Sequence, residues 1–228
     1  MKQFTCEAVL FDLDGVLVDS TACIERHWKD WAQKHGLDLQ EILAIAHGRR
    51  SIDTIRLIAP SLSAKREAHL LEQIEVQDTE GVITLPGAAS LLATLALSHW
   101  AVVTSGSQAL AAARLQAAGL PVPTVLIGAE DVVEGKPHPD GYLQAVQRLG
   151  LKPQHCLVIE DAPAGIAAAC AAQIPVIAVA TTHAPAQLQN ADVCVPSLEV
   201  LCVSPTPVSG ATRTASLTLT VTAEPSHG

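Results

Sequence analysis

The stretch Ala8-Val9-Leu10-Phe11-Asp12-Leu13-Asp14-Gly15 decides the fold that we predict for this chain. Its leading apolar residues have strong strand character, and they end abruptly in two aspartates and a glycine. Carboxylates are unfavourable within a buried strand, but at the end of a strand their side chains can reach a crevice. An Asp-Gly pair is also a common turn former, so this stretch alone is compatible with a simple acidic turn.

The composition is that of a globular protein with a sizeable core. The chain has 228 residues, of which 49% are apolar and 16% charged, and this length suits one large domain or one core with an insertion. The formal net charge is −9 and no basic run occurs. Because duplex nucleic acid needs a positive footprint on its partner, we expect no nucleic-acid binding.

Cysteine usage and the length of apolar runs bear on the cellular compartment. The six cysteines form no C-x-x-C pair and no metal-ligand spacing, so we interpret them as small hydrophobic residues of a reducing compartment. No apolar run approaches membrane-spanning length, and the acidic motif at residue 12 leaves no room for a signal peptide. We therefore expect a cytoplasmic protein without a membrane partner.

A helical pattern dominates residues 16–85. Apolar residues recur at near-3.6 spacing before Gly36, which provides a stop signal. We predict helices at 24–35, 40–47, 51–59 and 63–77. No strand is expected in this block, so we interpret it as an all-helical insertion that ends at Leu85-Pro86-Gly87.

From Gly87 onward, apolar strands alternate with helices. We predict strands at 100–103, 125–127, 156–159, 175–179 and 193–195. This alternation indicates βαβ units and a doubly wound parallel sheet of the α/β class. The alternating pattern at 217–221 predicts an edge strand or hairpin in the tail, or a flexible segment.

Polar groups follow three of the predicted strands. They are Asp12 and Asp14, Thr104 and Ser105, and Glu160 and Asp161. The carboxyl ends of parallel strands meet at one edge of the sheet, where ligands bind. Acidic residues gathered there would repel one another without a cation, and carboxylate oxygens with retained water suit Mg²⁺. Each set alone could be a helix cap or an acidic first turn, but several sets at equivalent positions favour a functional site.

The residue types in these sets predict phosphoryl transfer. Residues 104–107 supply hydroxyl and backbone N–H groups at a predicted helix start, which is a natural anion site. Lys136 adds a positive charge that can bind phosphate, although a lone lysine is more often a solvated surface residue. Asp12 would attack the phosphoryl group, Mg²⁺ and Lys136 would neutralise its charge, and Asp14 would protonate the leaving alkoxide and later activate water.

Four motifs, in their order along the chain, resemble those of the haloacid dehalogenase superfamily. They are Asp12-Leu13-Asp14-Gly15-Val16-Leu17-Val18-Asp19-Ser20, Val103-Thr104-Ser105-Gly106, Lys136-Pro137-His138-Pro139-Asp140 and Ile159-Glu160-Asp161-Ala162-Pro163-Ala164-Gly165. Over roughly residues 4–200, the chain resembles the branch of sugar phosphatases and β-phosphoglucomutase-like enzymes. Within that branch it is similar to bacterial phosphatases of hexose, pentose and polyol phosphates. Val16 stands where the family more often has threonine.

The resemblance implies a division of the chain into core, cap and tail. Residues 1–15 and 86–202 would form a Rossmann-like core, and residues 16–85 would form a small, mobile, all-helical cap. The segment 203–228 lies outside the shared motifs as a tail or edge hairpin.

The resemblance also implies roles for individual residues. Mg²⁺ would be held by Asp12, the Asp14 backbone carbonyl and Asp161, with Glu160 nearby or in the outer shell. The substrate-binding residues would be Asp12, Asp14, Thr104, Ser105 and Lys136 of the core, together with His47 and Arg50 of the cap loop.

Other functions share parts of this pattern. Dehalogenases of the superfamily lack the second aspartate. Phosphonatases use a cap lysine, whereas Lys29, Lys34 and Lys65 lie in ordinary amphipathic patterns. A two-component receiver domain has its acidic pair before the phosphorylated aspartate and no helical insertion. A β-phosphoglucomutase-like mutase keeps all four motifs and needs a cap that holds a second phosphate, which Arg49 or Arg50 could do, so it remains the alternative.

The predictions combine into one expected function. We expect a monomeric, Mg²⁺-dependent phosphatase that hydrolyses a small sugar or polyol monophosphate through an aspartyl-phosphate. The motifs do not identify the sugar, because specificity depends on how the cap meets the core.

Overall fold

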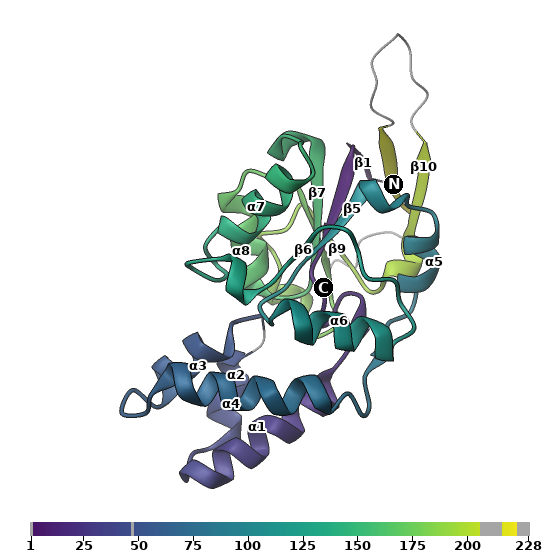
Figure 1. The fold of residues 1–228 in the computed structure, drawn as a ribbon. Coiled ribbons are helices and arrows are strands. Elements are labelled where there is room, and N and C mark those ends of the chain that lie inside the picture. The colour runs from purple at the N-terminus through teal and green to yellow at the C-terminus, as the bar shows by residue number, and fades with distance from the viewer. Residues whose placement is uncertain (1, 47, 206–215, 223–228) are drawn as a thin grey trace.

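A parallel β-sheet forms the centre of the computed structural model, which describes residues 2–46, 48–205 and 216–222 (Figure 1). Its strands are β2 (Ala8–Phe11), β5 (Trp100–Val103), β6 (Leu126–Ile127), β7 (Cys156–Glu160), β8 (Val176–Val179) and β9 (Val193–Val195). In space their order is β6-β5-β2-β7-β8-β9, so the strand that begins the pattern along the chain lies inside the sheet. The predicted α/β class with a doubly wound parallel sheet is confirmed.

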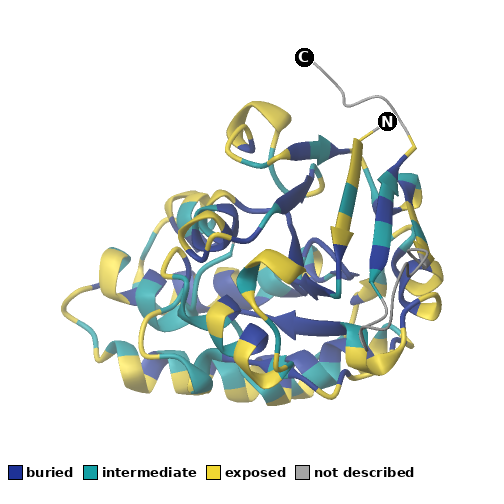
Figure 2. Ribbon diagram, turned by 90° about the horizontal axis from the view of Figure 1, so that it is seen from above, coloured by how far each residue is buried: buried dark blue, intermediate teal, exposed yellow. Residues whose placement is uncertain are grey.

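Helices cover both faces of this sheet. Helices α5 (Ala88–Ala93) and α6 (Gln108–Ala117) lie on one face, and α7 (Asp140–Arg148) and α8 (Pro163–Ala171) lie on the other (Figure 1). Successive residues of a strand point to opposite faces, and β2 accordingly contributes side chains to two separate apolar clusters. Every residue of the inner strands β5, β2, β7 and β8 is buried, as Figure 2 shows in dark blue and as expected for a sheet covered on both faces. Leu126 and Cys194 on the edge strands β6 and β9 are partly exposed.

Four helices form a separate unit at one end of the molecule, which we call the helical unit. They are α1 (Thr21–His35), α2 (Leu39–Ala46), α3 (Ser51–Ile58) and α4 (Ala64–Gln77). Apolar side chains of all four helices meet in a cluster of their own, in which Trp28 and Trp31 pack edge to face with their ring centroids 5.4 Å apart. Gly36 ends α1 in the left-handed conformation, as the predicted stop signal requires.

Two short strands join the helical unit to the rest of the molecule. Strand β3 (Val18–Asp19) pairs antiparallel with β4 (Ile83–Thr84), and Val18 lies opposite Thr84. The prediction of no strand between Val16 and Leu85 is therefore wrong. Each of these strands is too short to produce an alternating pattern, and they pair because the two connections to the helical unit run side by side.

A second, antiparallel sheet packs against the core. It contains β1 (Lys2–Cys6), β10 (Leu201–Pro205) and β11 (Leu217–Val221), in the spatial order β1-β11-β10. Because β11 is paired on both sides, it is the middle strand of this sheet and not an edge strand. Leu219 is fully buried in the same apolar cluster as Phe11. Residues 206–215 and 223–228 of the predicted tail lie outside the described residues.

The remaining expectations about location concern membranes and cysteines. In the part of the chain that the structure describes, no helix has the length and apolar character needed to cross a membrane. The six cysteines are free thiols, and burial raises the pKa of Cys6 and Cys156 to about 12, which keeps both thiols neutral.

We predict that β11 is a stabilising part of the core. Replacing Leu219 with alanine leaves a cavity in the cluster around Phe11, so L219A should lower the free energy of unfolding by about 2–5 kcal/mol in urea denaturation. Thr220 is only partly buried on the same strand, and T220A should change stability by no more than about 0.5 kcal/mol. Equal, small effects of the two substitutions would show that the strand contributes nothing to the core.

Candidate active site

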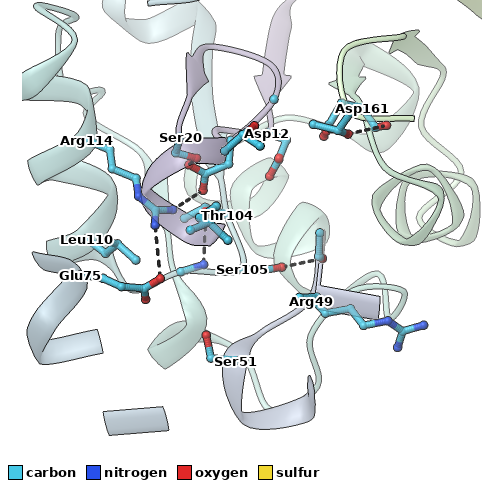
Figure 3. Close-up of a pocket in the computed structure, with 18 of the residues that line it drawn as sticks. Asp12, Ser20, Arg49, Ser51, Glu75, Thr104, Ser105, Leu110, Arg114 and Asp161 are labelled. Carbon is cyan, nitrogen blue, oxygen red and sulfur yellow. Dashed lines mark hydrogen bonds and ion pairs between the residues drawn. The ribbon is translucent and has the colours of Figure 1, made fainter. Parts of the chain in front are cut away.

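Three neighbouring strands carry the site at their carboxyl ends. Strand β2 lies between β5 and β7, so the residues that follow these strands come together. Asp12 follows β2, Thr104 follows β5, and Glu160 ends β7 just before Asp161. All four residues are buried. The convergence of polar residues that the strand pattern predicts is present. Figure 3 shows the cavity that Asp12, Thr104 and Asp161 line together with residues of α4 and α6.

Lys136 links the ends of all three strands. Its ammonium group donates to Asp12 Oδ1 and to Glu160 Oε1, each at 2.6 Å, and to the carbonyl oxygen of Val103 at 3.1 Å. Burial lowers the pKa of Lys136, but the carboxylates of Asp12 and Glu160 outweigh it and hold this pKa well above its usual value. Lys136 is therefore a permanent buried cation, not a solvated surface lysine.

Glu160 holds Lys136 in place. The Glu160 carboxylate is fully buried. Its Oε1 accepts hydrogen bonds from Lys136 and from the Tyr142 hydroxyl at 3.0 Å. Its Oε2 accepts from the backbone N–H groups of Asp161 at 2.9 Å and Ala162 at 3.0 Å. With both oxygens engaged, Glu160 acts as a support for the lysine.

The neighbouring carboxylates fit a divalent cation. One carboxylate oxygen from each of Asp12, Glu160 and Asp161 lies within 4.8 Å of the others, so three carboxylates face one ammonium group. Asp161 Oδ1 is buried and has no hydrogen-bond partner, while Asp161 Oδ2 accepts from Thr182. Burial raises the pKa of Asp12 to about 7 despite Lys136, and it raises the pKa of Asp161 well above its usual value. A bound divalent cation would relieve this excess of negative charge, with Asp12 and Asp161 as its carboxylate ligands.

A tight turn brings Asp14 to the same cavity. Gly15 has φ +83°, and a Cβ atom there would lie 2.2 Å from Asp161 Oδ2, so only glycine fits. The Asp14 carboxylate accepts from Ser20 Oγ at 2.6 Å and from Arg114 at 2.7 Å. Both contacts fix its orientation beside Asp12.

Arg114 connects Asp14 to the helical unit. This arginine comes from α6 and is almost fully buried. One of its terminal nitrogens binds Asp14 Oδ2, and the other lies 3.5 Å from Glu75 Oε1 on α4 (Figure 3). Burial raises the pKa of Glu75 to about 7, although Arg114 opposes the shift. The guanidinium group therefore bridges a carboxylate of the core and one of the helical unit.

The hydroxyl groups after β5 are only partly free for a substrate. Thr104 Oγ1 accepts from the Gly106 N–H at 3.1 Å, and Ser105 Oγ donates to the Gly48 carbonyl at 2.9 Å. Ser107, in contrast, caps α6 by accepting from the Leu110 N–H. Ser105 therefore joins the core to the loop that precedes α3.

The cap-loop residues named from the sequence occupy different positions. His47 lies outside the described residues. Arg50 pairs with Asp53 at 2.6 Å and donates to the carbonyl oxygens of Val132 and Val133, so it joins the helical unit to the core and does not line the cavity of Asp12. Arg49 does line that cavity, but its guanidinium group points away from Asp12 (Figure 3).

None of the lysines weighed for phosphonatase chemistry lines the cavity of Asp12 in the described structure. Lys34 lies 3.5 Å from Glu67 on the outside of the helical unit. Lys65 is exposed beside a larger hollow between α3, α4 and α6. The geometry therefore offers no cap lysine for a Schiff base at the site.

Sequence reasoning missed several residues of the site: Ser20, Glu75, Arg114, Tyr142 and Thr182. Ser20 could have been found from the sequence, because it lies close to Asp14 in the chain and belongs to the same motif. Arg114 is the single charged residue of an alanine-rich helix, and a lone arginine flanked by small apolar residues was a usable signal of burial. Glu75 offered no such signal, because it is one of several glutamates on α4.

Comparison with known proteins agrees with this geometry. The family model described as haloacid dehalogenase-like hydrolase matches residues 6–173. Hexitol phosphatase A of Escherichia coli is 46% identical over 210 residues, covering 89% of this chain and 96% of that protein. Glycerol-1-phosphate phosphohydrolase 2 of Saccharomyces cerevisiae is 37% identical, covering 77% of this chain and 75% of that protein. The crystal structure of β-phosphoglucomutase from Clostridium difficile superposes with a TM-score of 0.71 at 25% identity, covering 85% of this chain and 92% of that one.

The chain therefore belongs to the haloacid dehalogenase-like hydrolase family. The resemblance predicted from the four motifs is confirmed, as is the branch that contains sugar phosphatases and β-phosphoglucomutase-like enzymes. These relatives by sequence are named as enzymes that hydrolyse phosphoric monoesters, and the predicted enzyme class is confirmed.

We predict that Gly165 is required for the position of Glu160. A Cβ atom at Gly165 would lie 1.5 Å from Glu160 Oε1, so G165A must displace the carboxylate that holds Lys136. Loss of such a supporting contact should lower kcat/KM for phosphate release by roughly 10- to 100-fold.

The control is A164G in the same first turn of α8, which adds no atom near Glu160. It should lower the melting temperature slightly and leave kcat/KM within about twofold. If G165A kept wild-type kcat/KM, the proposed support of Lys136 by Glu160 would be wrong.

Proposed function

We propose that this protein is a Mg²⁺-dependent phosphatase of small sugar or polyol monophosphates that acts through an aspartyl-phosphate. The observation that carries the proposal is the pairing of Asp12 with Lys136 at the end of β2, beside Asp161 and two residues before Asp14. The names of the relatives support the substrate class, since one is a hexitol phosphatase and another a glycerol-1-phosphate phosphohydrolase.

Asp12 serves as the nucleophile. Its Oδ1 is held by Lys136 at 2.6 Å, so rotation of the carboxylate is restricted and Oδ2 is available to attack phosphorus. Lys136 has no alternative protonation state near neutral pH, since its pKa is raised by two carboxylates. It therefore neutralises charge on the phosphoryl oxygens throughout the reaction.

Asp14 serves as the proton donor and acceptor. Its carboxylate lies on the same loop as Asp12 and lines the same cavity. It protonates the leaving alkoxide in the first half of the reaction and removes a proton from the attacking water in the second half. Ser20 and Arg114 keep it aimed into the cavity in both halves.

Mg²⁺ would be held by Asp12 and Asp161, whose free oxygen Oδ1 lacks any other partner. When bound, the ion supplies positive charge that polarises the phosphoryl group and keeps Asp12 ionised. Mg²⁺ fits this site better than a softer metal would, because the available donors are carboxylate oxygens.

The helical unit serves as the cap that closes the site. The cavity around Asp12 and Asp14 has a volume of about 80 Å³ and is lined by both the core and the helical unit. The contacts of Ser105 with Gly48 and of Arg50 with Val132 hold the two parts together. Closure of this kind excludes bulk water from the reacting phosphoryl group.

A β-phosphoglucomutase-like mutase is the second candidate, because a solved β-phosphoglucomutase shares the fold over most of its length. A mutase must hold a second phosphate in its cap. Arg49 is the cap arginine that lines the cavity, so it would be the residue to bind that second phosphate.

We predict that D12N abolishes phosphate release. Asparagine keeps the size of the side chain but removes the nucleophilic carboxylate, so kcat should fall by a factor on the order of 10⁴ or more. The assay is release of inorganic phosphate from sorbitol 6-phosphate and glycerol 3-phosphate, with Mg²⁺ and with EDTA.

The matched control is D19N, because Asp19 belongs to the same motif but accepts a hydrogen bond from the Thr21 N–H before α1 and does not line the cavity. D19N should retain activity within about threefold, and EDTA should inactivate the wild type. Retained turnover in D12N would contradict the mechanism. Conversion of β-glucose 1-phosphate to glucose 6-phosphate with a bisphosphate primer, without phosphate release, would favour the mutase instead.

A further inference from the structure

Glu75 stands where the cavity of the reacting groups opens outward. We call the cavity lined by Asp12, Asp14, Thr104, Arg114 and Asp161 the inner cavity. The larger hollow of about 530 Å³ that Lys65, His69, Glu72 and Glu130 line is the outer hollow. Glu75 lines both spaces, together with Ser105 and Leu110 from the core. A leaving group that extends from a phosphoryl group at Asp12 into the outer hollow would pass this carboxylate.

The Glu75 carboxylate has unused capacity to accept hydrogen bonds. The side chain is buried, with 5% of the residue exposed. Its one charged partner in the described structure is Arg114, whose Nη2 lies 3.5 Å from Glu75 Oε1. This distance is too long for a good hydrogen bond donated by a cation. A buried carboxylate with so few donors is costly, so hydroxyl groups of a bound molecule would satisfy it.

The arginines around Glu75 leave little positive charge available to a bound anion. Arg114 is shared with Asp14, to which it is much closer, at 2.7 Å. Arg50 is engaged by Asp53 and by backbone carbonyls, and the guanidinium group of Arg49 points away from Asp12 (Figure 3). In the described residues, the rim of the inner cavity therefore presents a hydrogen-bond acceptor and no uncommitted cation, and the exposed Lys65 lines only the outer hollow.

We propose that Glu75 selects the leaving group: its carboxylate accepts hydrogen bonds from the hydroxyl groups of an uncharged polyol or sugar, and it excludes leaving groups that carry an anion close to the reacting phosphate. This inference rests on the proposed function and narrows its substrate class. Carboxylated phosphate esters and bisphosphates with closely spaced phosphates would be poor substrates. The same repulsion disfavours the second phosphate that a mutase needs.

The size of the effect follows from the two kinds of contact. A substrate hydroxyl donates a hydrogen bond to the buried carboxylate. When a neutral amide replaces that carboxylate, kcat/KM for the substrate should fall by roughly tenfold or more. An anion held against the same carboxylate is repelled at short range, and the repulsion weakens with distance. Discrimination should therefore be strong for a carboxylate two carbons from the phosphate ester and weak for one at the far end of a six-carbon chain.

The test uses substrate pairs that differ only at one terminal carbon, which is an uncharged hydroxymethyl group in one member and a carboxylate in the other. Glycerol 3-phosphate and 3-phosphoglycerate form the short pair, and sorbitol 6-phosphate and 6-phosphogluconate form the long pair. At pH 8 Glu75 is mostly ionised, because this pH lies above its raised pKa of about 7. The selectivity of each pair is the kcat/KM of the uncharged member divided by that of the carboxylated member.

We expect E75Q to lower the selectivity of the short pair at least tenfold and that of the long pair by less than threefold. The control E25Q removes an exposed carboxylate from α1 in the same helical unit and should leave both selectivities within twofold. A merely structural role of Glu75 would lower kcat/KM for all four substrates in proportion.

Two outcomes would overturn the proposal and are separate from failure of the proposed function. The first is unchanged selectivity in E75Q with a melting temperature like that of the wild type. The second is an equal change for the short and long pairs. Failure of the proposed function would appear in the wild-type enzyme, as no phosphate release from either uncharged substrate.

Discussion

The site depends on one constraint, which is that three buried carboxylates lie together with only one buried ammonium group among them. Asp12, Glu160 and Asp161 meet at the ends of two adjacent strands, and Lys136 touches only the first two. Charges removed from water must be paired and hydrogen-bonded, or they destabilise the fold. Glu160 is therefore surrounded by a tyrosine hydroxyl and backbone N–H groups, while Asp161 retains a free oxygen. The shortage of positive charge is what makes this edge of the sheet suited to a divalent cation.

The molecule divides the work between its two parts. The ends of the sheet strands carry the groups suited to phosphoryl transfer, held by rigid backbone. The helical unit lines the cavity beside these groups, through Glu75 and the loop at Gly48. Contact between the parts is polar at each of the points described: Ser105 with Gly48, Arg50 with Val132, and Arg114 with Glu75. Polar contacts of this kind exchange readily with water, so they suit an interface that opens and closes.

Sequence reasoning reached the residues whose roles are encoded locally. Asp12 and Asp14 could be placed because a strand, two carboxylates and a glycine are adjacent in the chain, and the strand pattern predicted the parallel sheet around them. Arg114 and Glu75 could not be placed in the same way, because their contact requires the relative position of α6 and α4, which lie on different parts of the molecule. Strand β11 was uncertain for a similar reason. Its alternation predicts a strand, but the partners β1 and β10 come from opposite ends of the chain.

The short pair of β3 and β4 has a consequence for the architecture as a whole. Because the chain leaves the core and returns to it through two paired strands, the points of departure and return are neighbours in space. In topological terms, the fifty-odd residues of α1–α4 are one enlarged hairpin loop inserted into a complete sheet. Insertions between adjacent points leave the host fold unchanged. The same core can therefore exchange this loop for one of different size and lining, so that the selection of substrates can diversify while the phosphoryl chemistry is preserved.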